Sequence, residues 1–182
     1  MQCKNTPTSF STFMKLTHWL IFILFVVQYF LVYRRSYLLD TAPEKLQYIL
    51  LHKSLGPIIL VLALLMLIAR IPGKRPPYPK VAWERKLAKT VHCGLYLALL
   101  LMPLSGITMS LLSGYGLSVF GWFDFPQWLA TNKVLAGSFY TLHVYTSYVV
   151  LSLVGLHIIG ALYHHCYRRD RSLKQILPES GK

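Results

Sequence analysis

Histidines are the residues of this chain best suited to chemistry, because most of them fall inside long apolar segments. Ionisable side chains in such segments are costly and uncommon in membranes, and they mark sites of function. Any single one is read most simply as a hydrogen-bonded structural residue. One in each of four apolar segments, with a second in the last, predicts a set of binding sites. The seven are His18, His52, His92, His143, His157, His164 and His165.

The pair in the last segment has the most informative spacing. His143 and His157 are 14 residues apart, so on a helix they share nearly one face and lie about 21 Å apart along the axis. A zinc site would need ligands three or four residues apart, or cysteines nearby. A proton relay would need closer spacing. The pattern predicts two sites at two depths of a membrane.

Four segments are long enough to cross a bilayer, since about 20 residues span its ~30 Å hydrocarbon core. The chain is 54% hydrophobic and only 14% charged, which suits a lipid solvent. We expect an all-α integral membrane fold, a four-helix transmembrane bundle that forms a single domain over residues 1–182. The helices should run from about Met14 to Tyr33, Leu46 to Ala69, Thr90 to Leu112 and Gly137 to Cys166.

Positive charge indicates the orientation of the bundle. Most of the 19 lysines and arginines lie in the N-terminal arm, the middle loop and the C-terminal tail, which places both termini in the cytoplasm. Cations between apolar runs suit lipid head groups rather than nucleic acid. The proline-rich stretch 71–79 should be an extended spacer, and the aromatic loop from Ser113 to Ala136 should lie on the outer leaflet.

Depth pairs the histidines on the outer side. His52 lies six residues after Leu46, at the outer end of the second segment, and His143 lies six residues after Gly137. The two imidazoles are therefore at matching depth and could hold one iron between them.

The inner side leaves a choice open. His157 needs a partner near an inner helix end, and both His18 and His92 qualify, since each lies three residues after a lysine. Depth alone does not decide between them.

Two imidazoles saturate a haem iron, which favours electron transfer over oxygen activation. No C-x-x-C-H motif offers covalent attachment, so we expect two b-type haems held by coordination and packing. Gly56 and Gly155 would let a flat macrocycle approach the backbone. Lys53 and Arg70 are candidate partners for the propionates by charge, although interfacial cations would look the same.

Several short stretches carry a family resemblance that extends from about Met14 to Pro178. In them the chain resembles the bacterial cytochrome b561 family, which is related to the cytochrome b subunits of nickel–iron hydrogenases and formate dehydrogenases. The stretches are T-H-W-L at Thr17–Leu20, H-K-S-L-G at His52–Gly56, H-C-G-L-Y at His92–Tyr96, P-L-S-G at Pro103–Gly106, and His164–His165 followed by Asp170, Leu173 and Pro178.

The resemblance implies a role for each intramembrane histidine. His18 and His157 would hold the inner haem iron, His52 and His143 the outer one, and His92 would be spare. It also implies a multi-pass protein of the bacterial inner (plasma) membrane that reduces a quinone such as ubiquinone. Some short members of the family take their electrons from superoxide at the outer face.

Two positions depart from the family pattern. Ser147 stands where a glycine beside the haem is common, which could tighten one pocket. Gln175 stands where the tail often has arginine.

Three functions fit these observations. The first is a stand-alone oxidoreductase from superoxide to ubiquinone, with His164 or His92 near the quinone and His165 among lipid head groups. The second is a haem-bearing anchor subunit for a dehydrogenase or hydrogenase, which the short tails disfavour. The third is a non-redox transporter with a histidine relay, against which stand the 14-residue spacing and the lack of Asp or Glu in the predicted spans.

Overall fold

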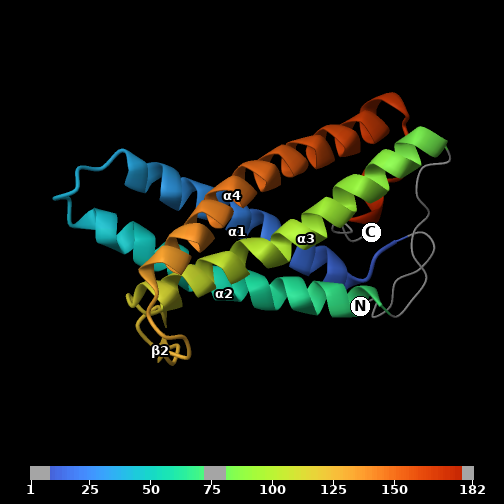
Figure 1. Ribbon diagram of the computed structural model, residues 1–182. Coiled ribbons are helices and arrows are strands. Elements are labelled where there is room, and N and C mark those ends of the chain that lie inside the picture. Colours follow the sequence, from blue (N-terminus) through green and yellow to red (C-terminus); the bar gives the residue numbers. More distant parts are fainter. Residues whose placement is uncertain (1–8, 72–80, 178–182) are drawn as a thin grey trace.

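The computed structural model describes residues 9–71 and 81–177, and four long helices dominate it (Figure 1). Each is long and apolar enough to cross a membrane, so the expected four-helix membrane fold is confirmed. The helices are α1 (Thr12–Ser36), α2 (Glu44–Arg70), α3 (Ala82–Ser113) and α4 (Lys133–Leu162).

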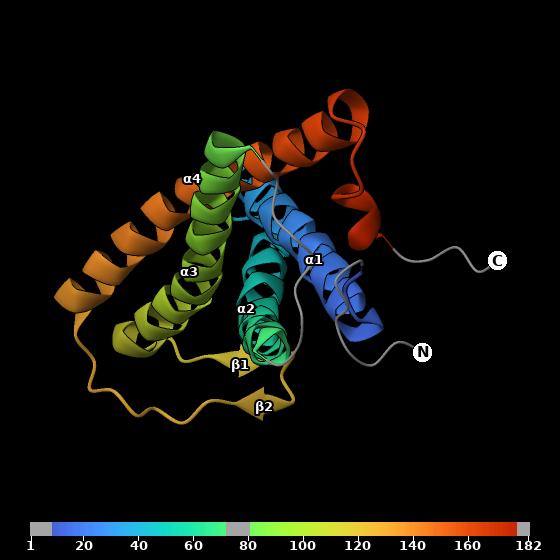
Figure 2. The ribbon, with the colours of Figure 1, turned by 90° about the vertical axis from the view of Figure 1, so that its right-hand side faces the viewer.

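Helix α3 is the central element of the bundle. It packs against both α2 and α4, while α1 packs on the other side of α2 (Figure 2). One third of the apolar span of α3 is buried, against 11% of the spans of α1 and α4. The outer helices therefore leave most of their apolar surface to the lipid, which carries the hydrophobic stabilisation that a core supplies in water.

Three of the predicted helix ends lie four or more residues from those in the structure. Helix α3 begins at Ala82 rather than near Thr90, because its charged first turns lower the local hydropathy without ending the helix. Helix α4 begins at Lys133 rather than near Gly137. It ends at Leu162 rather than near Cys166, and the chain continues in one π-helical turn, η1 (Tyr163–Tyr167), which hydropathy does not distinguish from an α-helix. Hydropathy reports the span inside the lipid, so it does not register helix that continues beyond it.

The outer loop contains a short ladder that an all-α expectation did not include. Strands β1 (Ser118–Val119) and β2 (Phe123–Asp124) pair antiparallel. The side chain of Ser54, on α2, accepts the Phe120 N–H at 2.9 Å. The aromatic Trp122 is 91% exposed, as expected of a loop that meets the outer leaflet. The loop is thus fastened to α2 two residues beyond His52.

The tail returns to the start of α1 at the opposite end of the bundle. The Trp19 indole N–H donates to the Ile176 carbonyl at 3.0 Å, and the Phe10 N–H donates to the Gln175 carbonyl at 3.3 Å. The short helix η2 (Leu173–Gln175) lies there. The contact at Gln175 uses its backbone carbonyl and not its side chain.

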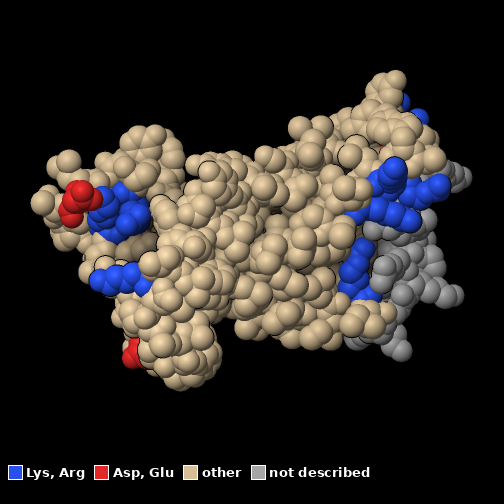
Figure 3. Space-filling view, in the orientation of Figure 1, with Lys and Arg blue, Asp and Glu red and all other residues tan. Residues whose placement is uncertain are grey.

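Lysine and arginine side chains gather at the two ends of the molecule, with an uncharged band between them (Figure 3). This band is what a bilayer would surround. Residues 72–80, where an extended proline-rich spacer was expected, lie outside the described residues.

Candidate functional site

The outer histidines come together between α2 and α4. The ring centroids of His52 and His143 are 6.0 Å apart, and the planes stand at 87°. A metal held between two imidazole nitrogens at about 2 Å from each would place the two centroids roughly 6 Å apart. The sequence-predicted outer pair therefore has the separation that iron ligation requires.

Helix α3 fixes the ring of His143 from behind. The Nδ1 atom lies 2.9 Å from the Met102 carbonyl oxygen and 3.1 Å from Ser105 Oγ. A neutral imidazole that donates Nδ1–H to this carbonyl keeps a lone pair on Nε2, the tautomer that a metal ligand needs. A Cβ at Gly106 would lie 3.0 Å from His143 Cε1, so glycine is what allows the ring to lie against α3.

The P-L-S-G stretch, Pro103–Gly106, therefore helps to position the His143 ring. The Ser105 hydroxyl donates to the Met102 carbonyl of its own helix at 2.8 Å, and it also contacts the predicted ligand His143. The adjacent Ser105 and Gly106, inside an apolar span, are the sequence signal that could have pointed to the place where His143 packs on α3.

The inner site brings three histidines together instead of two. His157 of α4 lies 6.2 Å from His18 of α1 and 5.1 Å from His92 of α3, measured between ring centroids. The predicted partner and the predicted spare therefore flank the same ring. The larger separation matches an iron between two nitrogens, whereas the shorter one leaves less room for a metal.

One histidine at each site has a buried ring nitrogen without a hydrogen-bond partner in the described part of the chain. In the described part of the chain, Nδ1 of His18 and Nδ1 of His52 have no hydrogen-bond partner. Buried polar atoms nearly always have one. A Cβ at Gly56, one turn beyond His52, or at Gly155 would meet no atom within 4 Å. The ring nitrogens without partners and the open space beside these glycines fit a flat ligand with a metal at its centre.

The remaining predicted residues lie around these two sites. Lys53 Nζ lies 3.4 Å from the Gly116 carbonyl oxygen, beneath the outer loop. The Arg70 guanidinium lies over the ring of Tyr96, 4.9 Å from its centroid. The Ser147 hydroxyl bonds the Val144 carbonyl in its own helix at 2.7 Å.

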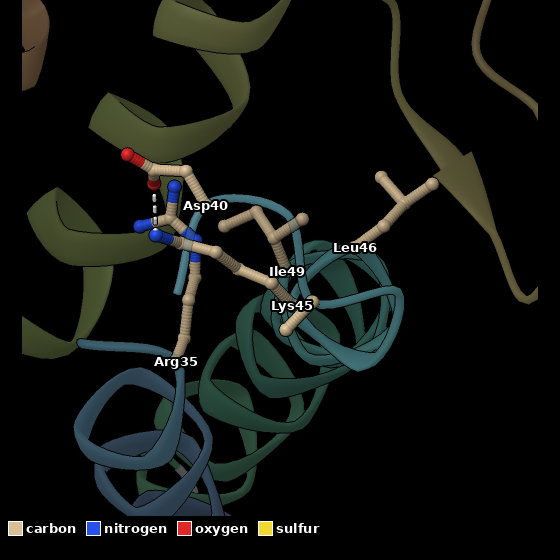
Figure 4. A pocket seen from close by; sticks show the side chains of 6 residues that line it. Arg35, Asp40, Lys45, Leu46 and Ile49 are labelled. Atoms are coloured by element: carbon tan, nitrogen blue, oxygen red, sulfur yellow. Dashed lines mark hydrogen bonds and ion pairs between the residues drawn. The ribbon is translucent and has the colours of Figure 1, made fainter. Parts of the chain in front are cut away.

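A hollow of about 300 Å³ opens at the outer end, between the ends of α1 and α2 (Figure 4). Arg35, Asp40 and Lys45 line its polar side. Asp40 pairs with Lys45, whose hydrogen bond and charge lower the pKa of the Asp40 carboxyl. With that pair neutral overall, the charge of Arg35 leaves the hollow positive. Ile49, one turn outward of His52, forms part of its wall.

The inner end of α4 holds a polar cluster that sequence reasoning missed. His164 Nδ1 lies 2.6 Å from Asp170 Oδ2, and Arg168 pairs with the buried Glu84 of α3 at 2.8 Å. Both contacts join residues whose proximity depends on the π turn. No local pattern in the sequence announces such a turn.

A helical membrane bundle with imidazoles paired across it at two depths has the features of a membrane cytochrome. A family model described as prokaryotic cytochrome b561 matches residues 9–179. The chain belongs to this family, and the family implies that it carries haem b and transfers electrons in the membrane.

Three relatives extend over most of the chain. It is 31% identical to "Cytochrome b561 homolog 2" of Escherichia coli (strain K12), over 100% of this chain and 97% of the relative. It is 26% identical to "Cytochrome b561 homolog 1" of the same organism, over 88% and 92%. It is 27% identical to "Probable superoxide oxidase CybB" of Yersinia pestis, over 89% and 92%.

Proposed function

We propose that the protein binds two b haems in the bacterial inner membrane and carries electrons from superoxide at its outer face to ubiquinone. One observation carries the part of this proposal that concerns the haems: a single helix, α4, presents two histidines at two depths. Each has an imidazole from another helix at the separation that an iron between them needs, 6.0 Å and 6.2 Å between ring centroids. Both termini would lie in the cytoplasm, as the positive charges predict.

The ligands follow from the pairing. His52 and His143 would hold the outer iron, and His18 and His157 the inner one. Haem, when bound, supplies a one-electron redox centre. Two imidazoles leave no open coordination position, so the donor must pass its electron to a haem edge. Lys53 and Arg70 remain candidates for the propionates.

Superoxide is the donor that the outer surface suits best. It is a small anion that crosses lipid poorly, and Arg34, Arg35 and Lys133 lie at the outer end, where cations can collect it. Arg35 keeps the hollow above the outer site positive. A relative of similar length is named as a probable superoxide oxidase.

The acceptor would be reduced near the inner site, where His164 and His92 are the candidate polar partners. Each superoxide gives up one electron and becomes dioxygen. Ubiquinone takes two electrons and two protons to become ubiquinol, so two superoxide ions are consumed for each quinone.

Haem content tests the first half of the proposal. Pyridine haemochrome analysis of the purified protein should give two b haems per chain. One haem per chain, or a c-type spectrum, would contradict it. A protein without a haem spectrum would favour the histidine-relay transporter.

Rapid mixing with superoxide tests the second half. The haem absorbance should report fast reduction, and its rate should fall as salt screens the outer cations. Quinone added afterwards should reoxidise the haems. If superoxide has no effect and a dehydrogenase subunit reduces the haems readily, the anchor-subunit function is the better one.

A further inference from the structure

The inner end of α4 is shaped by contacts that the electron path alone does not require. The helix leaves α-geometry at Tyr163 and makes one π turn, a distortion that often accompanies functional sites. Glu84, whose side chain is 4% exposed, receives Arg168 at 2.8 Å and lies 3.5 Å from the Tyr163 hydroxyl. A buried carboxylate of α3 thus fastens both ends of the turn.

The chain then folds back so that a carboxylate meets a histidine. Arg169 has a φ of 52°, a left-handed conformation that a non-glycine residue adopts only when its surroundings enforce it. It brings Asp170 to His164, with Oδ2 2.6 Å from Nδ1. The other oxygen, Oδ1, accepts the Ser172 N–H at 2.8 Å. The Asp170 N–H donates to the His164 carbonyl at 3.1 Å.

The two partners differ in their access to water. The side chain of His164 is 13% exposed and that of Asp170 is 37% exposed. Burial alone would raise the pKa of the Asp170 carboxyl, but the hydrogen bonds from Ser172 and His164 outweigh it and lower that pKa. Asp170 is therefore an anion held against the ring, and its side chain is the more exposed of the two.

Such a carboxylate decides how the imidazole can act. It holds the Nδ1 proton, so Nε2 is the nitrogen left to exchange a proton with another group. His164 lies seven residues after His157, about 10 Å further inward.

We propose that His164 and Asp170 form a proton-donating pair for the quinone, with His164 Nε2 giving the proton and Asp170 acting as the positioning residue. This rests on the proposed function. As each electron arrives from the inner site, the quinone oxygen takes a proton from Nε2, and the imidazole regains one from water on the inner side. Two such cycles supply the two protons of ubiquinol.

The test separates electron donation to quinone from haem loading. Protein with both haems prereduced by dithionite is mixed with a short-chain ubiquinone, and haem oxidation is followed by absorbance. Asp170→Asn keeps an oxygen for Nδ1–H but removes the charge, so oxidation should slow roughly 10- to 100-fold. Reduction of the haems by superoxide should stay unchanged, because it occurs at the outer end.

Conservative and chemical rescue distinguish this role from a structural one. Asp170→Glu should recover most of the rate, and His164→Gly should regain rate when free imidazole is added. Asp124→Asn, an exposed carboxylate change on β2, should behave as the unaltered protein. A normal oxidation rate in a haem-replete Asp170→Asn protein would overturn the pair. If the unaltered protein gives no electrons to quinone, the proposed function fails, and the pair with it.

Discussion

The outer and inner histidine groups share helix α4 but are built on different plans. At the outer end two rings face each other, and the backbone of α3 orients one of them through the Met102 carbonyl. At the inner end α3 contributes a third ring, His92, in place of a carbonyl. The same central helix thus supports one site with a fixed hydrogen bond and the other with a further imidazole.

This difference has a consequence for how each site should tolerate change. The outer site depends on few atoms in defined positions, so a small shift in α3 reaches the ligand directly. At the inner site, among the residues that the structure describes, α3 contributes no hydrogen bond to the two predicted ligands; it places a third ring beside His157, at the shorter separation of 5.1 Å. We therefore expect the outer site to be the more sensitive of the two to changes in α3.

The largest effect should come from removing a ligand on α4. His143→Ala should abolish the outer haem and keep most of the inner one, because an iron with one of its two imidazoles binds weakly. His157→Ala should do the reverse. Pyridine haemochrome analysis should show one haem per chain in each case. Thr141→Ala, an exposed change two residues before His143, should keep both haems, and loss of both from His143→Ala would mean that the sites are not independent.

The inner site offers a choice that can be decided by a pair of variants. His18→Ala should cost the inner haem or leave it high-spin, whereas His92→Ala should keep a low-spin haem there. Optical and electron paramagnetic resonance spectra distinguish these states. The opposite result would show that His92 is the ligand and that the shorter separation, 5.1 Å, widens when iron binds.

The sequence indicated the spans, the outer pair and the inner candidates because each depends on local periodicity and depth. Hydropathy located α1 and α2 to within a few residues, and the spacing of His143 and His157 survives because α4 is continuous between them. The hydrogen bond from His143 to the Met102 carbonyl could not be predicted from the sequence, because every residue has a backbone carbonyl. The His164–Asp170 contact could not be predicted either, because it depends on a π turn and a left-handed residue.

A smaller effect should follow from adding a methyl group on α3 where the His143 ring packs against it. In Gly106→Ala the new Cβ would lie 3.0 Å from the ring, so the imidazole must move by a few tenths of an ångström. The outer haem should remain bound, with a shifted midpoint potential and a broadened low-spin signal, while the inner haem is unchanged. Redox titration followed by absorbance measures this. Gly137→Ala, where a Cβ meets no atom within 4 Å, is the matched control, and an equal shift in both variants would refute the steric explanation.

The smallest effect should come from Ser105→Ala. The hydroxyl lies 3.1 Å from His143 Nδ1, but the Met102 carbonyl lies closer, at 2.9 Å, and remains as an acceptor in the variant. Loss of one shared hydrogen bond is worth about 1 kcal/mol at most, which for one electron corresponds to a potential shift of no more than about 40 mV. The potential of the outer haem should rise, because a ring whose Nδ1 proton is held less strongly donates less charge to the oxidised iron.

Ser113→Ala is the matched control. It removes the same kind of bond, since the Ser113 hydroxyl also donates to a carbonyl three residues earlier at 2.8 Å. Ser113 lies about two turns from Ser105, so this change should leave both potentials unchanged. A shift confined to the inner haem in Ser105→Ala would show that α3 couples the two sites instead of serving each one separately.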